Sequence, residues 1–236
     1  MITCNCVVAI VLAAGRSTRM GGGENKVLRP LEGRSVLSYS LDAFQKSPVV
    51  SHVVVTGRME DESVINGIIK EFCPKAKGNF TIGGAERFDS VKQGLNYSAS
   101  YKPDAVLIHD SARPFIEERF IIDSLNALKE SPGSVIGIPL RDSLKETDAS
   151  GLVIRTHERS KYWFSQTPQT FRFSDIYDAY NTCSPPPYPT DDGEVMELFG
   201  GKVKMVEGSP LNFKLTTKED WLLARAVAQA RQKSNT

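Results

Sequence analysis

Short apolar runs alternate with segments of helical periodicity along most of the chain. The run 7–15 (VVAIVLAAG) is apolar at consecutive positions and ends in small residues. This pattern is typical of a strand buried on both faces, as in a parallel sheet covered by helices. The segment 63–72 instead places five apolar residues at helical spacing, which predicts an amphipathic helix.

These two patterns predict alternating strands and helices as far as residue 140. Such alternation, with helices of about ten residues or more, implies right-handed crossovers and a mostly parallel sheet. We therefore expect an α/β fold, a Rossmann-like three-layer sandwich, as a single domain spanning residues 1–236. The predicted strands are 7–15, 52–56, 80–82, 105–109 and 134–140, and the predicted helices are 35–46, 63–72, 89–97 and 119–129.

The alternation stops at residues 141–160, where the sequence is mostly polar. Two short stretches, 144–146 and 152–156, flank a turn sequence whose glycine favours a positive φ. We predict a protruding β-hairpin arm inserted within the domain. An isolated two-stranded hairpin is marginal in water, so the arm needs support from the parent domain or a second subunit. Beyond it we expect a helix at 174–181, strands at 203–207 and 212–216, and a closing helix at 218–231.

Composition excludes several classes of protein. The chain has 29 basic and 28 acidic residues, a formal net charge of +1, which argues against a dedicated nucleic-acid binder. Four cysteines without a C-x-x-C pair and three histidines give no zinc-site spacing. The apolar stretch 7–14 is far shorter than the about 20 residues of a membrane span, and no basic residue precedes it. We expect a cytoplasmic protein, or one from a plastid-type compartment.

Candidate chemistry lies after the first predicted strand, in the segment 12–26 (LAAGRSTRMGGGENK). Ligands of such sheets bind at the carboxyl ends of strands, so this segment is searched first. Small residues let a ligand approach the backbone, and Arg16, Arg19 and Lys26 supply three positive charges for phosphate groups. The segment is neither a P-loop nor the dinucleotide fingerprint. The alternative is a solvated basic loop without a ligand.

Further motifs follow in order along the chain. Together they resemble the family of 2-C-methyl-D-erythritol 4-phosphate cytidylyltransferases, within the nucleotidyltransferases that activate sugar and polyol phosphates. The resemblance covers residues 7–230 and implies that a substrate phosphate attacks the α-phosphorus of CTP, releasing pyrophosphate. Ribitol-5-phosphate cytidylyltransferases share most of these motifs, and a binding protein without turnover is a third hypothesis. The motifs are A-A-G-x-x-x-R-M with Lys26, GGAERFDSV at 83–91, HDSARP at 109–114, TPQ at 167–169 and FKLT at 213–216.

The resemblance assigns roles in the CTP half of the site. It implies that Arg19 and Lys26 stabilise the reacting α-phosphate and the leaving pyrophosphate. It also implies that Asp110 lies near the ribose and a divalent cation such as Mg²⁺, directly or through water. Many relatives have Asp where this chain has Ala85, which removes one possible contact to the base. The residues expected to bind CTP are Ala13, Ala14, Gly15, Arg16, Gly83, Gly84, Ser90 and Asp110.

The resemblance also implies a homodimer in which the arm, residues 141–160, closes the partner's active site. Ser143 and Arg159 on the arm would hold the substrate phosphate, with Thr190 and Lys214 from the other subunit. Arg113 is a further candidate for that phosphate, or for a neighbouring carboxylate. The alternative for the arm is a solvated flap. His109, a lone histidine at a strand end, is expected to be structural.

Overall fold

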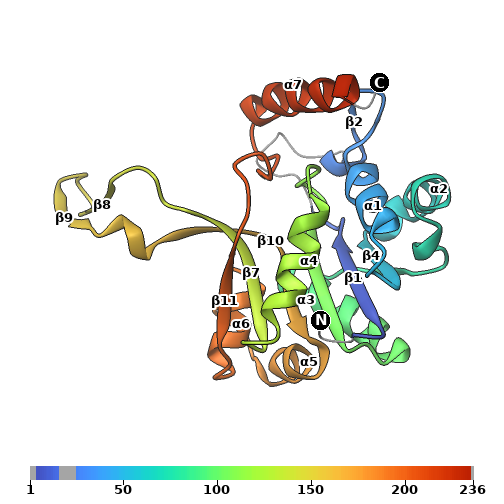
Figure 1. Ribbon diagram of the computed structural model, residues 1–236, viewed down its shortest axis with the longest axis horizontal. Helices are drawn as coiled ribbons and strands as arrows, with labels where there is room; N and C mark the ends of the chain where they lie inside the picture. Colours follow the sequence, from blue (N-terminus) through green and yellow to red (C-terminus); the bar gives the residue numbers. More distant parts are fainter. Residues whose placement is uncertain (1–3, 16–24, 235–236) are drawn as a thin grey trace.

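The computed structural model describes residues 4–15 and 25–234. Its centre is a seven-stranded sheet in the order β11-β7-β10-β6-β1-β4-β5, shown in Figure 1. Only β10 runs antiparallel to its neighbours in this sheet, and it separates β7 from β6. The strands are β1 (Val7–Leu12), β4 (His52–Gly57), β5 (Phe80–Ile82), β6 (Ala105–Asp110), β7 (Gly133–Pro139), β10 (Trp163–Arg172) and β11 (Val203–Glu207).

Helices cover both faces of the sheet, because alternate residues of each central strand face opposite sides. In β1, Val7, Ala9 and Val11 belong to one apolar cluster, whereas Val8 and Ile10 belong to the other. The three-layer α/β prediction is therefore confirmed. The first cluster includes residues of α1 (Val36–Lys46), α2 (Glu62–Phe72), α4 (Glu118–Ala127) and α7 (Lys218–Ser234). The second includes residues of α3 (Arg87–Ser98), α5 (Phe173–Thr182) and α6 (Asp192–Leu198).

Short elements complete the described chain. A small hairpin of β2 (Pro30–Leu31) and β3 (Arg34–Ser35) turns at Gly33, whose φ of +89° suits glycine. No helix within the described ranges is long and apolar enough to cross a membrane. The single-turn 3₁₀ helices are η2 (Lys26–Leu28), η3 (Met59–Asp61), η4 (Pro74–Ala76), η5 (Ala99–Tyr101) and η6 (Arg159–Lys161).

The arm forms a separate two-stranded sheet of β8 (Leu144–Thr147) and β9 (Val153–His157). Figure 1 shows this hairpin projecting away from the central sheet, connected through the ends of β7 and β10. Its residues are almost all exposed. The predicted hairpin is thus confirmed as an element.

Two strand predictions were wrong. Residues 212–216 form no strand: Asn212 is fully buried, and the Leu215 amide donates to the Ala112 carbonyl oxygen, so loop contacts hold this segment. The long strand β10 was not predicted, because a proline and polar side chains interrupt its apolar pattern and its register with β7 shifts between Ser165 and Gln169. The seven-residue helix α6 was also missed.

Candidate active site

A cavity of about 390 Å³ opens at the carboxyl ends of β1 and β6. These strands are hydrogen-bonded neighbours, with Leu12 in register with Asp110, so the residues that follow them meet at one edge of the sheet. This is the edge at which the sequence predicted a ligand. The lining residues are Leu12, Ala13, Ala14, Gly15, Asn25, Lys26, Val27, Gly84, Ala85, Glu86, Arg87, Ser90, Asp110, Ser111, Ala112 and Lys214.

Asn25 anchors the chain where it enters the cavity beside Lys26. Its buried side-chain amide donates to the Ala13 carbonyl oxygen at 2.7 Å and to a carboxylate oxygen of Asp61 at 2.8 Å. Asp61 is in turn paired with Arg58 at 2.6 Å. The Lys26 ammonium group donates to the Leu215 carbonyl oxygen at 2.7 Å.

These contacts place Lys26, one of the two predicted catalytic residues, at the cavity. The predicted residues Arg16 and Arg19 lie outside the described residues. Asn25 was not predicted as a site residue.

Of the two predicted glycines, Gly84 lines this cavity, whereas Gly83 lines a second cavity beside β5. A Cβ at Gly83 would lie 2.6 Å from the Ala14 Cβ, and one at Gly84 would lie 2.1 Å from the Asp89 Cβ. Both positions therefore need glycine for space. The Gly84 amide donates to the Ser90 hydroxyl oxygen at 3.1 Å, so this segment and α3 form one unit beside the cavity.

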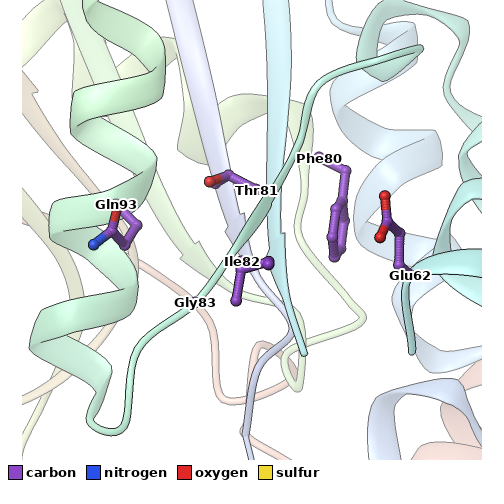
Figure 2. Close-up of a pocket in the computed structure, with 6 residues that line it drawn as sticks. All are labelled: Glu62, Phe80, Thr81, Ile82, Gly83 and Gln93. Carbon is purple, nitrogen blue, oxygen red and sulfur yellow. The ribbon is translucent and has the colours of Figure 1, made fainter. Parts of the chain in front are cut away.

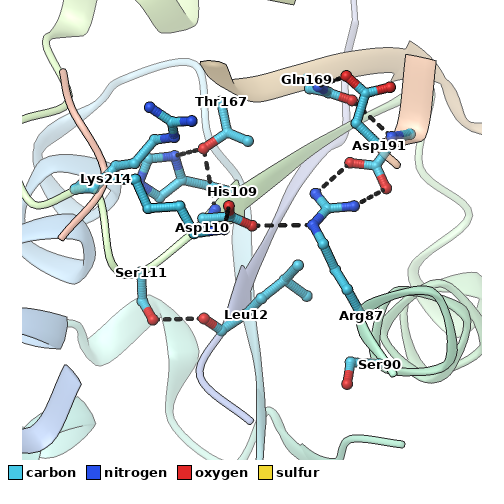
Figure 3. Close-up of polar contacts among 12 residues, drawn as sticks. Leu12, Arg87, Ser90, His109, Asp110, Ser111, Thr167, Gln169, Asp191 and Lys214 are labelled. Carbon is cyan, nitrogen blue, oxygen red and sulfur yellow. Dashed lines mark hydrogen bonds and ion pairs between the residues drawn. The ribbon is translucent and has the colours of Figure 1, made fainter. Parts of the chain in front are cut away.

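Asp110 is held between two cations at the end of β6. Its Oδ1 accepts from the Arg87 Nε at 3.1 Å, and its Oδ2 accepts from the Lys214 Nζ at 2.6 Å, as Figure 3 shows. Burial alone would raise the pKa of Asp110, but the charges of Arg87, Lys214 and Arg113 hold it well below its usual range. Asp110 is therefore a carboxylate, and it is the acidic group of the cavity that faces Lys214.

Arg87 connects Asp110 to a second, fully buried carboxylate. Its two Nη atoms donate to the two oxygens of Asp192 at 2.8 and 2.7 Å. Asp192 also accepts from the Tyr180 hydroxyl at 2.6 Å, and its amide donates to the Gln169 side-chain oxygen at 2.8 Å. Sequence reasoning gave Arg87 no role and missed Asp192, because no motif joins residues 105 positions apart.

His109 lies fully buried beneath the site and has the structural role that was expected. Its Nε2 lies 3.1 Å from the Arg113 carbonyl oxygen, which can only accept, so Nε2 holds a proton. Its Nδ1 lies 3.0 Å from the Thr167 hydroxyl, which already accepts from the Asp110 amide and therefore donates to Nδ1. Burial lowers the pKa of His109 to about 4, in agreement with this neutral form. The ring thereby connects the loop at Arg113 with strand β10 at Thr167.

Arg113 does not line the cavity. Its Nη1 donates to the Asn212 carbonyl oxygen at 2.9 Å and its Nη2 donates to the Ser165 carbonyl oxygen at 3.4 Å. Its Nε is buried without a hydrogen-bond partner. A role in binding the substrate phosphate stays a prediction for this residue.

The predicted phosphate pocket for the acceptor is not assembled within one chain. Ser143 and Arg159 are exposed on the arm, and the Arg159 Nη1 donates to the Arg141 carbonyl oxygen at 2.5 Å. The Thr190 amide and hydroxyl donate to a Glu194 carboxylate oxygen, at 2.6 and 2.8 Å. Of the four residues that were expected to form this pocket, only Lys214 lines the cavity.

The donors at the cavity fit a Mg²⁺ ion that is bound together with phosphate groups. Within residues 4–15 and 25–234, no group of three or more His, Cys, Asp or Glu side chains could hold a metal. Asp110 offers one hard carboxylate ligand beside cationic groups. Mg²⁺ commonly takes one or two carboxylates and completes its coordination with phosphates and water. Asp110 is thus the residue that would hold such an ion.

A second, more open cavity of about 520 Å³ lies beside the edge strand β5. Figure 2 shows the Phe80 and Glu62 side chains on one side of β5 and Gln93 on the other. Its lining contains one carboxylate and no basic side chain, so it does not suit a nucleoside triphosphate. The smaller cavity with Lys26 and Lys214 is the candidate active site.

Comparisons with known proteins point to one family. Residues 7–230 match the profile of a family described as 2-C-methyl-D-erythritol 4-phosphate cytidylyltransferase. A curated relative of that name from Syntrophotalea carbinolica is 36% identical over 222 residues, 93% of this chain and 95% of its own. A crystal structure of 4-diphosphocytidyl-2C-methyl-D-erythritol synthase from Anaerococcus prevotii superposes with a TM-score of 0.82, at 30% identity, covering 95% of this chain and 96% of the other. The corresponding cytidylyltransferase from Thermus thermophilus gives a TM-score of 0.71, at 26% identity, over 93% and 98% of the two chains.

Proposed function

The chain belongs to the 2-C-methyl-D-erythritol 4-phosphate cytidylyltransferase family, and we propose that it transfers CMP from CTP to 2-C-methyl-D-erythritol 4-phosphate. The products are 4-diphosphocytidyl-2-C-methyl-D-erythritol and pyrophosphate. One observation supports this best: a cavity lined by Gly84 holds Lys26, Lys214 and the ionised Asp110 together.

The reaction needs positioning and charge neutralisation more than a protein nucleophile. A phosphate oxygen of the acceptor forms a bond to the α-phosphorus, the bond from that phosphorus to the bridging oxygen breaks, and pyrophosphate leaves. Lys26, with Arg19, neutralises the charge that develops on the α-phosphate and the leaving group. A Mg²⁺ ion held by Asp110 would supply further neutralisation of the triphosphate. No step requires a covalent enzyme intermediate.

Recognition of the base is assigned to backbone around the glycines. Gly84 lines the cavity and has no side chain, so a ligand can approach its main chain there. Its amide donates to the Ser90 hydroxyl oxygen, which holds Ser90 beside it. Ala85 lines the same cavity and adds no polar group. We therefore assign discrimination between cytosine and uracil to main-chain groups and to the Ser90 hydroxyl.

The arm supports a homodimer in which each subunit completes the other's site. Leu152, Val153 and Ile154 on the arm are 70%, 59% and 64% exposed, and Phe164 at its base is 57% exposed. Such contiguous apolar side chains mark surfaces that a partner covers. Ser143 and Arg159 lie on the same arm, and we assign to them the binding of the acceptor phosphate in the partner's cavity.

The decisive test is Mg²⁺-dependent pyrophosphate release. CTP is assayed with 2-C-methyl-D-erythritol 4-phosphate and, separately, with ribitol 5-phosphate; ATP, UTP and GTP replace CTP in parallel. We expect release with CTP and the methylerythritol acceptor only. Release only with ribitol 5-phosphate would assign another acceptor to the same mechanism. A folded protein that binds CTP and releases nothing would contradict the proposal and favour a binding protein.

A further inference from the structure

A row of four charged side chains runs from the cavity into the interior of the protein. Asp192, Arg87, Asp110 and Lys214 follow one another with alternating sign, and each neighbouring pair is joined at 2.6–3.1 Å. Arg87, Asp110 and Lys214 line the cavity, whereas Asp192 does not. Asp192 has no exposed surface at all.

Stability alone does not account for this arrangement. Taking a carboxylate and a guanidinium out of water costs several kcal/mol per ion, and well-packed apolar residues often serve a core equally well. The geometry is also specific: both Nη atoms of Arg87 are used by Asp192, which leaves the Nε for Asp110. A lysine ammonium has no such fork and could not hold both carboxylates in this way.

Asp192 is itself held rigidly. The Tyr180 hydroxyl donates to its Oδ1, and the Tyr180 ring stacks on Phe88, the residue next to Arg87, with ring centres 4.6 Å apart. The Gln169 side chain accepts from the Asp192 amide and from the Gly193 amide. The orientation of Arg87 is therefore set from α5, α6 and β10, and not by the cavity.

We propose that Arg87 and Asp192 are positioning residues for Asp110. Asp192 occupies the forked face of Arg87, so that Arg87 makes a single contact with Asp110, at Oδ1, while Lys214 contacts Oδ2. The remaining lone pairs of the carboxylate are then available to a divalent cation bound with the nucleotide. The pair of Arg87 and Asp192 also fixes α6, which begins two residues after Thr190, to the start of α3 beside the glycine segment. This inference rests on the proposed function, because Asp110 acts there with the nucleotide.

The test uses Asp192→Asn in the full-length protein. Without the Asp192 charge, the Arg87 fork is free to close on Asp110 and compete with the cation. We define the Mg²⁺ gain as the ratio of the CTP dissociation constants measured by calorimetry without and with Mg²⁺. We expect Mg²⁺ to strengthen CTP binding in the wild type, and we expect the Mg²⁺ gain to be smaller by a factor of about 10 or more in the variant. The Mg²⁺ concentration for half-maximal turnover should rise by a similar factor. We expect kcat to fall by a larger factor than the factor by which KM for the acceptor changes.

Matched variants separate positioning from packing. Asp192→Glu keeps the carboxylate and should restore most of the Mg²⁺ gain. Glu197→Gln removes an exposed carboxylate from the same helix and should leave the gain at its wild-type value. If Asp192→Asn does not fold, as judged by circular dichroism, Arg87→Lys replaces it; it keeps the charge but loses the fork, and should lose the gain too.

The outcomes are distinct. An unchanged Mg²⁺ gain in a folded Asp192→Asn or Arg87→Lys protein overturns the inference. Equal loss in Asp192→Asn and Asp192→Glu shows a packing role and overturns it as well. A wild-type protein that releases no pyrophosphate contradicts the proposed function instead, and the calorimetric comparison of wild type and variants still decides whether Arg87 and Asp192 govern the cation.

Discussion

The cavity and the arm differ in how firmly they hold their charged side chains. At the cavity, Asp110, Arg87 and Lys214 are held by the fold in fixed contact, and Asp192 behind them is fully buried. At the end of the arm, Glu158 pairs with Lys161 just beyond it, and the side chains of Lys161 and Glu158 are 72% and 64% exposed. Exposed pairs of this kind contribute little, about 0–1 kcal/mol. One chain thus holds the charged groups of the cavity in fixed contact. Under the proposed function, the acceptor half of the site is organised by contact with another subunit.

The largest effect that tests this contrast is expected at Lys26. Lys26→Ala removes a cation from the cavity, so turnover should fall about 10²–10³-fold while the melting temperature changes little. Steady-state pyrophosphate release and thermal unfolding measure the two quantities. Lys70→Ala, at an exposed position on α2, is the control and should retain wild-type turnover. A loss below about threefold would remove Lys26 from the catalytic residues.

The second prediction tests whether the arm acts in the partner subunit. Lys26→Ala and Arg159→Ala homodimers should each be strongly impaired. In a mixed dimer, one site combines an intact cavity with an intact arm, so about half of the wild-type activity per dimer should return. Differently tagged subunits are co-purified and assayed. Mixed dimers that form and stay inactive would show that Arg159 serves its own chain.

The third prediction concerns the buried ring beneath the cavity. The pKa of His109 is about 4 in the folded protein against 6.5 for an ordinary histidine, so the unfolded chain binds more protons between these values. Stability should therefore decrease as the pH falls from about 6.5, by up to about 1.4 kcal/mol per pH unit, and gain nothing from this group above 6.5.

Urea unfolding at pH 7.0, 6.0 and 5.0 measures this slope, in a range where carboxylates are still ionised. His109→Asn should be less stable at every pH and lack that part of the slope. A wild-type protein with the same free energy of unfolding at pH 7.0 and pH 5.0 would contradict the neutral buried imidazole.

The contrast between the two regions also explains what the sequence could predict of the fold. Strands β1, β4 and β6 are continuous apolar runs, because helices cover both of their faces. The predicted bounds of β4 and β6 agree with the structure to within one residue, whereas β1 ends at Leu12, three residues before the predicted end. Strand β10 has polar side chains and Pro168 in its centre, and it is buried through contacts with the site. The periodicity of apolar residues does not predict such a strand, because its polar groups form hydrogen bonds with partners that are distant in sequence.

The site was predictable where its residues lie close in sequence. Gly84, Ser90, Asp110 and Lys214 were found through motifs, and the structure brings them to one cavity. Asp192 was missed, because its burial depends on Tyr180 and Arg87, which reach it from other elements. Asn25 was likewise missed, although it immediately precedes Lys26. Residues that orient other residues leave no local pattern when their partners are set by tertiary structure.

The central position of β10 has a consequence for synthesis on the ribosome. Both sheet neighbours of β7, which are β10 and β11, come after it in the chain. A nascent chain that has emerged only to the end of the arm can pair β5, β4, β1 and β6, but β7 has no strand to join. Its apolar residues Val135 and Ile136 then stay uncovered until β10 emerges. We expect this interval to be the time at which the growing chain is most prone to aggregate and most readily bound by a chaperone.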